Sequence, residues 1–261
     1  PGALAEADFL SRCTKCGQCM RICPTNVIQP DGLAGGLESL WTPVLNFRIG
    51  SSGCQVNCIA CGHVCPTAAI RPLEIEERLG RGTYAAKGPV RIGTAFVDRG
   101  RCLPWAMDRP CIVCQENCPV SPKAIYTREH FNLVRMDTPL IVKHIGLDHI
   151  QLTSDRLTPG QLASGDYYGR LQGQPEADRR KIVASTADRL ALAPTPGWEP
   201  ITPETETMLL VEIRLQRPWV DPQRCIGCGV CQHECPVKGR RAIRVTAENE
   251  SRSREHVLLL S

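Results

Sequence analysis

Near its start the chain carries the run Cys13-Thr14-Lys15-Cys16-Gly17-Gln18-Cys19-Met20-Arg21-Ile22-Cys23-Pro24. Its four cysteines are separated by two, two and three residues, and a proline follows the last of them. This spacing is typical of loops that hold a cubane iron–sulfur cluster. Three thiolates then surround one cluster, and the fourth points away to ligate a neighbouring cluster.

The run recurs along the chain. All sixteen cysteines fall into four groups of four, and each group ends in Cys-Pro. The fourth group repeats the spacing of the first, whereas the second opens with Cys-x3-Cys and the third places eight residues between its first two cysteines. Soft thiolates select iron–sulfur clusters over hard cations. We therefore predict four [4Fe–4S] clusters with these ligands: Cys13, Cys16, Cys19, Cys23, Cys54, Cys58, Cys61, Cys65, Cys102, Cys111, Cys114, Cys118, Cys225, Cys228, Cys231 and Cys235.

Other uses of cysteine fit this pattern less well. Zinc sites commonly pair two Cys-x2-Cys motifs across a longer loop, and disulfide frameworks are typical of short secreted chains. The stretch Cys54–Cys61 also matches the cysteine spacing of radical S-adenosylmethionine enzymes, but Cys65-Pro66 follows it and no long strand–helix alternation surrounds it. Sixteen cysteines for four clusters leave no iron open for a substrate. We therefore predict no catalytic residue, and an enzyme with an open-site cluster is the weaker hypothesis.

The charge and composition of the chain limit the kinds of partner that it could bind. The formal charge of +4 counts every cysteine as neutral, whereas each oxidised cubane with its thiolates adds roughly −2. The loaded protein is then mildly acidic, and its arginines are scattered without interleaved aromatic residues, so we expect no nucleic-acid partner. The chain has no run of eighteen apolar residues that could cross a bilayer. It begins at Pro1 without a Met, and we expect any targeting segment to lie upstream.

An internal repeat indicates the fold. Val97-Asp98-x2-Arg101-Cys102 and Val220-Asp221-x2-Arg224-Cys225 have the same pattern. An apolar pair also recurs after each Cys-Pro: Val27-Ile28, Ala69-Ile70, Ala124-Ile125 and Ala242-Ile243. The repeat corresponds to a strand, a cluster loop, a short helix and a second strand, which is half of a two-cluster ferredoxin domain. The predicted class is α+β, with two bacterial-type two-cluster ferredoxin domains, many loops and a cysteine-free insertion.

We place the domain boundaries by the cysteine groups. Residues 1–53 form the first half-unit, 54–130 a central two-cluster domain, 131–217 an inserted cap or docking arm, and 218–261 the last half-unit. The second and third groups are 36 residues apart and the third and fourth 106. We therefore expect a nested arrangement, in which the middle groups pair and 218–261 pairs with 1–53. Tandem pairing, first with second and third with fourth, remains the alternative.

The insertion has its own pattern. Strand-like runs cover Leu140–Ile150 and Met208–Leu215, and a helix is predicted over Ala177–Leu192. Asp166-Tyr167-Tyr168 and Trp198 are candidates for partner contacts, with simple packing as the alternative. The tail Val257–Leu260 predicts a terminal strand.

Several other residues lie within or beside the cysteine groups. We expect four glycines to let backbone amides approach cluster sulfurs: Gly17, Gly62, Gly227 and Gly229. His63 and His233 are expected to donate hydrogen bonds rather than to ligate iron. Arg101 and Arg224 each precede a ligand, and they either raise a cluster potential or form surface salt bridges. Trp105 either packs in the protein, shields a cluster or contacts a partner.

The chain resembles the NapG/MauM group of ferredoxin-type proteins. The resemblance covers roughly residues 1–128 and 217–246. It rests on these segments: Pro1–Leu4, Phe9–Leu10, Cys16–Cys19, Cys61–Pro66, Ile92–Ala95, Asp98–Trp105, Cys111–Cys114 and Cys225–Gly229. Members are also similar to the four-cluster subunits of molybdenum oxidoreductases, in which the pairing is nested.

This resemblance implies a function. NapG-like proteins are exported in the folded state by a twin-arginine signal, and they relay electrons between a membrane quinol-oxidising partner and a periplasmic redox chain. The expected location is then the periplasm or the outer face of the membrane, with the cytoplasm as the alternative. The expected partners are membrane-bound or multi-subunit redox proteins of a respiratory chain, docking through 131–217. A permanent iron–sulfur subunit of a larger oxidoreductase is the alternative function. Only the cluster ligands are carried over from the family.

Overall fold

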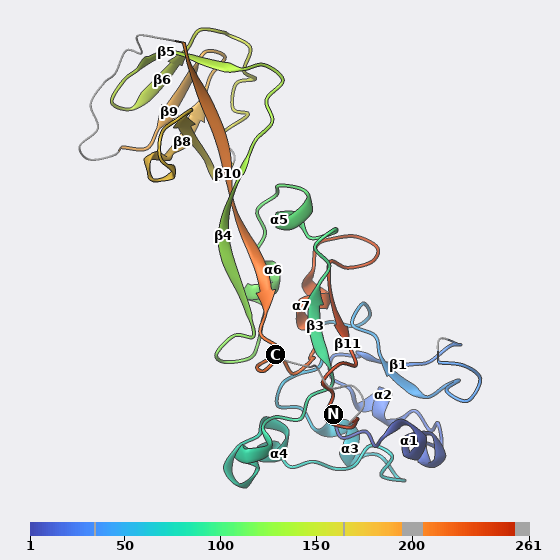
Figure 1. Cartoon of the computed structure of the whole chain (residues 1–261). Coiled ribbons are helices and arrows are strands. Elements are labelled where there is room, and N and C mark those ends of the chain that lie inside the picture. Colours follow the sequence, from blue (N-terminus) through green and yellow to red (C-terminus); the bar gives the residue numbers. More distant parts are fainter. Residues whose placement is uncertain (34, 164, 195–205, 254–261) are drawn as a thin grey trace. The chain divides into compact units, whose positions relative to one another are not determined.

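The computed structural model describes residues 1–33, 35–163, 165–194 and 206–253 (Figure 1). The chain divides into two compact units. Unit 1 consists of Pro1–Ala106, Ile112–Thr127 and Pro218–Ser261, and unit 2 of Met107–Cys111 and Arg128–Arg217. The insertion expected at 131–217 therefore begins slightly earlier, and it includes a short segment from inside the third cysteine group.

Unit 1 contains short helices and short strands joined by the cysteine loops. Its elements are α1 (Glu6–Arg12), α2 (Gln18–Ile22), β1 (Ile28–Pro30), β2 (Pro43–Leu45), α3 (Ala60–His63), α4 (Ile75–Leu79), the 3-10 helix η1 (Gly82–Lys87), β3 (Thr94–Val97), α5 (Leu103–Ala106), α6 (Val113–Glu116), α7 (Val230–Glu234) and β11 (Ile243–Thr246). Among the helices that the structure describes, none combines the length and the apolar composition that a membrane crossing requires.

Two modules inside unit 1 share one pairing scheme. In the first, an antiparallel bridge between Ala3 and Ile70 joins the chain before the first cysteine group to the chain after the second. In the second, β3 and β11 form the equivalent antiparallel pair, with Val97 opposite Ile243. The strand after the earlier group also pairs with the strand before the later one, as β1 with β2 and as β4 (Ile125–Leu133) with β10 (Thr207–Val220). The internal repeat is therefore structural.

Each module has its own small core. The apolar pairs after the Cys-Pro dipeptides are buried, and Val27, Ala69 and Ala124 are each only 1% exposed. One cluster of buried residues collects Phe9, Phe47 and cysteines of the first and second groups. The other collects apolar residues of β3 and β11 with cysteines of the third and fourth groups. The cysteines thus form a large part of both cores.

Unit 2 is built on an antiparallel sheet that closes on itself. Its strands are β4, β5 (Leu140–Ile145), β6 (His149–Leu152), β7 (Tyr167–Leu171), β8 (Arg180–Ser185), β9 (Arg189–Leu192) and β10, with the 3-10 helix η2 (Glu176–Asp178) before β8. The strand order is β4-β10-β5-β6-β9-β8-β7, and β10 also pairs with β7. Six strands therefore form a closed barrel, which has no free sheet edge of its own.

The barrel core is aliphatic. Alternate side chains point inward along the strands, and the buried cluster contains Leu140, Val142, Ile150, Ile182 and Leu190, among others. The strand register shifts between Val142 and His144 and again between Ile182 and Ala184. Such bulges bend strands and are common in barrels. Tyr167 packs against this core, which favours packing over partner contact for that residue.

The secondary structure expected for the insertion was only partly right. The strands over Leu140–Ile150 and Met208–Leu215 are confirmed, but the helix over Ala177–Leu192 is wrong, because the segment forms η2, β8 and β9. Barrel closure gives β8 and β9 hydrogen-bonding partners and buries Ile182 and Leu190, and these tertiary interactions outweigh local helix propensity. Trp198 and the strand expected at Val257–Leu260 lie outside the described residues.

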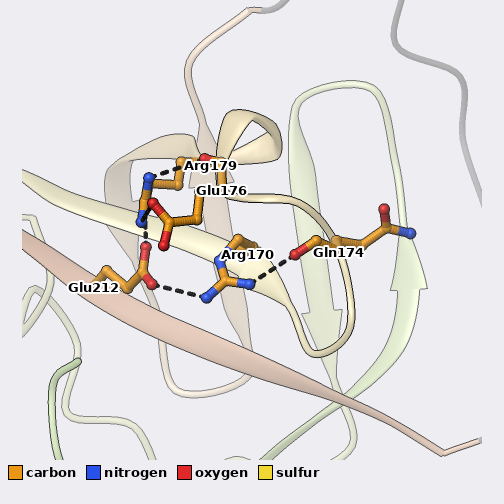
Figure 2. Close-up of polar contacts among 5 residues, drawn as sticks. All are labelled: Arg170, Gln174, Glu176, Arg179 and Glu212. Carbon is orange, nitrogen blue, oxygen red and sulfur yellow. Dashed lines mark hydrogen bonds and ion pairs between the residues drawn. The ribbon is translucent and has the colours of Figure 1, made fainter. Parts of the chain in front are cut away.

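A buried carboxylate at the barrel wall joins strands β10 and β7 to the residue that precedes β8 (Figure 2). Glu212 of β10 accepts a hydrogen bond from Arg170 of β7 at 3.0 Å and another from Arg179, which precedes β8. Arg179 also pairs with Glu176 at 3.0 Å, and its guanidinium stacks over Phe131, 4.2 Å from the ring centroid. Burial acts to raise the pKa of Glu212, but the two arginines outweigh it and hold that pKa below its ordinary value.

We predict that Glu212→Gln destabilises the barrel selectively. The change removes the carboxylate that two largely buried guanidinium groups share, although Arg179 keeps its ion pair with the exposed Glu176. Breaking such an interaction costs about 3 kcal/mol. Hydrogen exchange of β7, β8 and β10 in the cluster-loaded protein should then lose roughly a hundredfold in protection. Glu129→Gln is the control, since Glu129 is half-exposed and 4.0 Å from Arg214. Equal protection in both variants would show that the network contributes nothing to barrel stability.

Candidate iron–sulfur sites

None of the sixteen cysteines, all of which lie in the described residues, forms a disulfide bond, and most are buried or half-buried. Cys16 is the exposed one. Fifteen belong to unit 1 by their positions in the chain, and Cys111 belongs to the segment of unit 2 that lies inside the third group. Within the described residues, no three His, Cys, Asp or Glu side chains converge closely enough to hold a single metal ion.

Two cavities in the first module collect cysteines from both of its groups. One is lined by Cys13, Cys16 and Cys19 together with Cys65. The other, of about 810 Å³, is lined by Cys54, Cys58 and Cys61 together with Cys23. Each cavity therefore receives three cysteines of one run and the last cysteine of the other. This is the ligand exchange of a two-cluster ferredoxin, so the residues present fit two cubane clusters.

In the second module the cysteines gather in the same way. Cys118, the last of the third group, lies close enough to interact electrostatically with Cys225, Cys228 and Cys231 of the fourth. Cys235, the last of the fourth group, is buried in one cluster with Cys102 and Cys114. The role of Cys111 as a ligand stays a prediction from the spacing.

The nested pairing expected from sequence separation is therefore wrong, and the structure brings the groups together in tandem. First-group cysteines share a core with second-group cysteines, and third-group with fourth. The physical reason is the insertion. The chain leaves the second module along β4 and returns to it along β10. Because these two antiparallel strands are neighbours, the two ends of the insertion lie side by side. A long intervening segment then adds little to the cost of closing the loop.

The repeated Val-Asp-x2-Arg-Cys sequence has a local structural cause. The amide of Cys102 donates to the carbonyl oxygen of Asp98 over 3.0 Å, and the amide of Cys225 donates to that of Asp221 over 3.0 Å. Both bonds close the turn that presents the first cysteine of a group. Arg101 and Arg224 differ from each other: Arg101 donates to backbone oxygens of Arg240 and Lys238, whereas Arg224 forms a surface ion pair with Asp221 at 3.2 Å.

Backbone conformation or close packing requires glycine at each of the four expected positions. Gly17 and Gly229 have φ of 73° and 74°, in the left-handed region, and each precedes the short helix of its cysteine loop. A Cβ on Gly62 would lie 2.4 Å from the Arg71 carbonyl oxygen, and one on Gly227 would lie 2.5 Å from that of Gly93. Approach of their amides to cluster sulfurs stays a prediction.

Burial makes the deepest thiols hard to ionise. Burial, with the nearby Cys61 thiol, raises the pKa of Cys19 to about 11. Burial likewise raises the pKa of Cys228 to about 12 and that of Cys231 well above its ordinary value. Thiolates in such surroundings need a compensating cation, and the irons of a cluster supply that charge.

The pKa values of the last cysteines of the first two groups are lowered instead. Burial acts to raise the pKa of Cys23, but the hydroxyl of Thr25 and nearby backbone amides overcome it, and the pKa is lowered. For Cys65, burial is likewise outweighed by the Ile70 amide, 3.4 Å from its sulfur, and by Thr67. The Thr hydroxyl oxygens lie 3.6 Å from Cys23 Sγ and 3.8 Å from Cys65 Sγ.

Sequence reasoning missed these two threonines. Their signal is the tripeptide Cys-Pro-Thr, which ends the first and second groups, whereas Cys-Pro-Val ends the third and fourth, with Val120 and Val237. A ligated sulfur carries no proton, so the hydroxyl must donate. Hydrogen bonds to ligand sulfurs are among the factors that set cluster potentials.

The remaining candidates have structural partners. His63 Nε2 lies 3.0 Å from the Leu73 carbonyl oxygen and His233 Nδ1 lies 3.2 Å from that of Phe47, which agrees with hydrogen bonding rather than iron ligation. Trp105 packs edge-on against Trp219, with ring centroids 5.6 Å apart, and its indole N–H donates to the Pro218 carbonyl oxygen. The guanidinium of Arg99 lies over both rings. Packing is therefore the observed role of Trp105.

Comparison with known families agrees with this geometry. Residues 12–69 match the model of a 4Fe-4S dicluster domain, and residues 216–237 match that of a 4Fe-4S binding domain. The first match spans both groups of the first module. Ferredoxin-type 4Fe-4S domains are therefore present in both modules.

Several ferredoxin-type proteins are similar to this chain in sequence. The ferredoxin-type protein NapG of Escherichia coli K12 is 37% identical over 127 residues, which are 48% of this chain and 49% of NapG. The methylamine utilization ferredoxin-type protein MauM of Methylobacillus flagellatus is 32% identical over 126 residues, 48% of each chain. NapG- and MauM-type ferredoxin proteins are homologues of this chain. The ferredoxin-type protein NapF of E. coli K12 is 32% identical over 123 residues, 47% of this chain and 58% of NapF. The chain thus matches only about half the length of NapG and MauM.

We predict that Thr25→Val lowers the potential of the cluster ligated by Cys23. Valine keeps the shape of threonine but cannot donate, so the more negative reduced state loses a stabilising bond. A differential of about 1 kcal/mol corresponds to roughly 40 mV for one electron. The measurement is an EPR-monitored redox titration.

The reciprocal change Val120→Thr, beside Cys118, is the matched variant and should raise a potential in the second module. Unchanged titrations in both variants would show that the hydroxyl does not donate to the ligated sulfur.

Proposed function

We propose that this chain is an electron-transfer protein that relays single electrons through four [4Fe–4S] clusters. The observation that carries the proposal is the pair of cavities in the first module, each lined by three cysteines of one run and the last cysteine of the other. The match of residues 12–69 to a dicluster domain supports it independently.

The four cluster sites follow the tandem arrangement. In the first module Cys13, Cys16 and Cys19 act with Cys65, and Cys54, Cys58 and Cys61 act with Cys23. In the second, by the same exchange, Cys102, Cys111 and Cys114 act with Cys235, and Cys225, Cys228 and Cys231 act with Cys118. Every cysteine is then a ligand, and every iron has its protein thiolate. This leaves no open iron for an enzyme reaction, so the protein tunes potentials by burial and by hydrogen bonds to sulfur.

The partners we propose are a membrane-bound, quinol-linked redox protein and a second oxidoreductase, in the periplasm or at the outer face of the membrane. The resemblance to NapG-type proteins supports this placement. The barrel is the proposed docking element, since it exposes the apolar side chains of Leu133, Leu147 and Val183. If docking is permanent, the chain is the iron–sulfur subunit of a larger complex. Co-purification with a catalytic subunit at high salt would favour that alternative over a diffusible carrier.

The decisive test of the function is the iron and acid-labile sulfide content of the anaerobically purified protein, combined with EPR during a stepwise redox titration. We expect about sixteen irons per chain, and spin-coupled S = 1/2 signals from neighbouring reduced cubanes. Fewer irons, or a signal that changes when S-adenosylmethionine is added, would contradict a four-cluster relay and favour an open-site enzyme.

The tandem ligand assignment makes a separate prediction about paired substitutions. Cys16→Ala and Cys65→Ala should each remove one cluster, and because both residues serve the same cluster, the double variant should lose no more iron than either single one, about four atoms. Cys16→Ala with Cys118→Ala should lose about eight, since these residues serve different clusters. Cys16→Ala with Cys19→Ala gives the baseline for two ligands of one cluster. Under nested pairing, the first double variant would instead lose about eight irons.

A further inference from the structure

The loop of the fourth cysteine group packs against the chain that leads into the second group. The amide of Cys54 donates to the carbonyl oxygen of Cys228 over 2.7 Å. Beside this bond, the amide of Ile92 donates to the carbonyl oxygen of Ile226 over 3.0 Å. Two predicted ligand residues from different modules are thereby joined by one hydrogen bond, within unit 1.

Glycines make this approach possible. A Cβ added to Gly53 would lie 2.3 Å from the carbonyl oxygen of Cys228 and 2.4 Å from the amide nitrogen of Val230. A Cβ added to Gly229 would lie 2.0 Å from the Phe47 ring. Any side chain at Gly53 therefore forces the loops of the second and fourth groups apart. The atoms that it would meet belong to the backbone and cannot rotate away as the end of a flexible side chain could.

The first cysteine group differs from this junction in its exposure to solvent. The first group includes Cys16, the exposed cysteine, whereas Cys54 and Cys228 are both buried. The buried contact therefore joins the second group to the fourth and leaves part of the first group open to solvent.

We propose that electrons cross between the modules at the contact of Cys54 with Cys228. The inference rests on the proposed four-cluster function. Ligand exchange holds the first group with the second and the third with the fourth, so the contact fixes the order of the relay as first, second, fourth and third. In the crossing step one electron leaves a reduced centre at one of these two groups and reduces an oxidised centre at the other. No bond is made or broken and no proton moves.

The physical basis is distance. Electron tunnelling weakens steeply as the gap between redox centres grows, and a hydrogen bond between ligand residues gives a short path through the protein. The first and third groups are then the terminal sites of the relay, where external partners exchange electrons. The exposed position of Cys16 agrees with the first group being one of these ends.

The first experiment removes the terminal clusters. The double variant Cys16→Ala with Cys111→Ala keeps the clusters at the second and fourth groups, and Cys58→Ala with Cys228→Ala keeps those at the first and third. After reduction with dithionite, we expect magnetic coupling between the clusters in the EPR spectrum of the first variant, and isolated signals in the second. Coupling in the second variant and none in the first would overturn the proposed order.

The second experiment leaves all ligands in place, and it decides the question if a double variant fails to keep its clusters. Gly53→Ala should retain about sixteen irons, but rapid-freeze EPR after substoichiometric reduction should show a severalfold slower redistribution of electrons among the clusters. Gly32→Ala is the control, because a Cβ there meets no atom within 4 Å. A Gly53→Ala protein with full iron and the speed of the control overturns the proposal. An unaltered protein with far fewer than sixteen irons contradicts the four-cluster function itself.

Discussion

A cubane cluster needs four thiolates at the corners of a tetrahedron, and one short loop supplies only three of them well. The fourth must come from elsewhere in the chain. In the first module the last cysteine of the partner group lies in the required place, since Cys65 lines the cavity of the first group and Cys23 lines that of the second. Under the proposed ligand exchange, each half-unit is tied to its partner through two shared clusters. The short strands and short helices of unit 1 bury small apolar cores, and the cysteines form part of these cores.

The same constraint explains how the chain tolerates a large insertion. The second module needs its halves together, yet 106 residues separate its cysteine groups. Most of these residues form a barrel with a separate aliphatic core and a buried Glu212 between two arginines. Because β4 and β10 pair as neighbours, the insertion begins and ends at adjacent strands. In the first module the corresponding connection is the much shorter link between β1 and β2. The same pairing of two neighbouring strands therefore accommodates a short connection in the first module and an inserted barrel in the second.

The two modules are alike in ligand pattern but differ in the chemistry around their sulfurs. The first has hydroxyls of Thr25 and Thr67 beside the last cysteine of each group, and the second has Val120 and Val237 in those positions. Because donors to sulfur favour the reduced cluster, this difference acts to give the first module the higher potentials. The hydrogen bond from the Cys54 amide to the Cys228 carbonyl oxygen is the proposed crossing point between the two modules. The effect of the hydroxyls on the reduction potentials therefore favours electron flow from the second module to the first.

The grouping of the cysteines and the half-unit repeat can be read from the amino-acid sequence alone, because cluster chemistry restricts cysteine spacing to few patterns. The sequence also predicted the buried apolar pairs after each Cys-Pro, such as Val27-Ile28, and the hydrogen-bonding roles of His63 and His233. Which cysteine groups pair became clear only from the folded chain. The number of residues between two groups does not show whether the two ends of an insertion lie side by side. The tertiary structure also decided that Arg180–Leu192 forms strands, because closing the barrel supplies the partners that local propensity cannot anticipate. The approach of Gly53 to Cys228 likewise depends on two loops far apart in sequence, and no local pattern marks it.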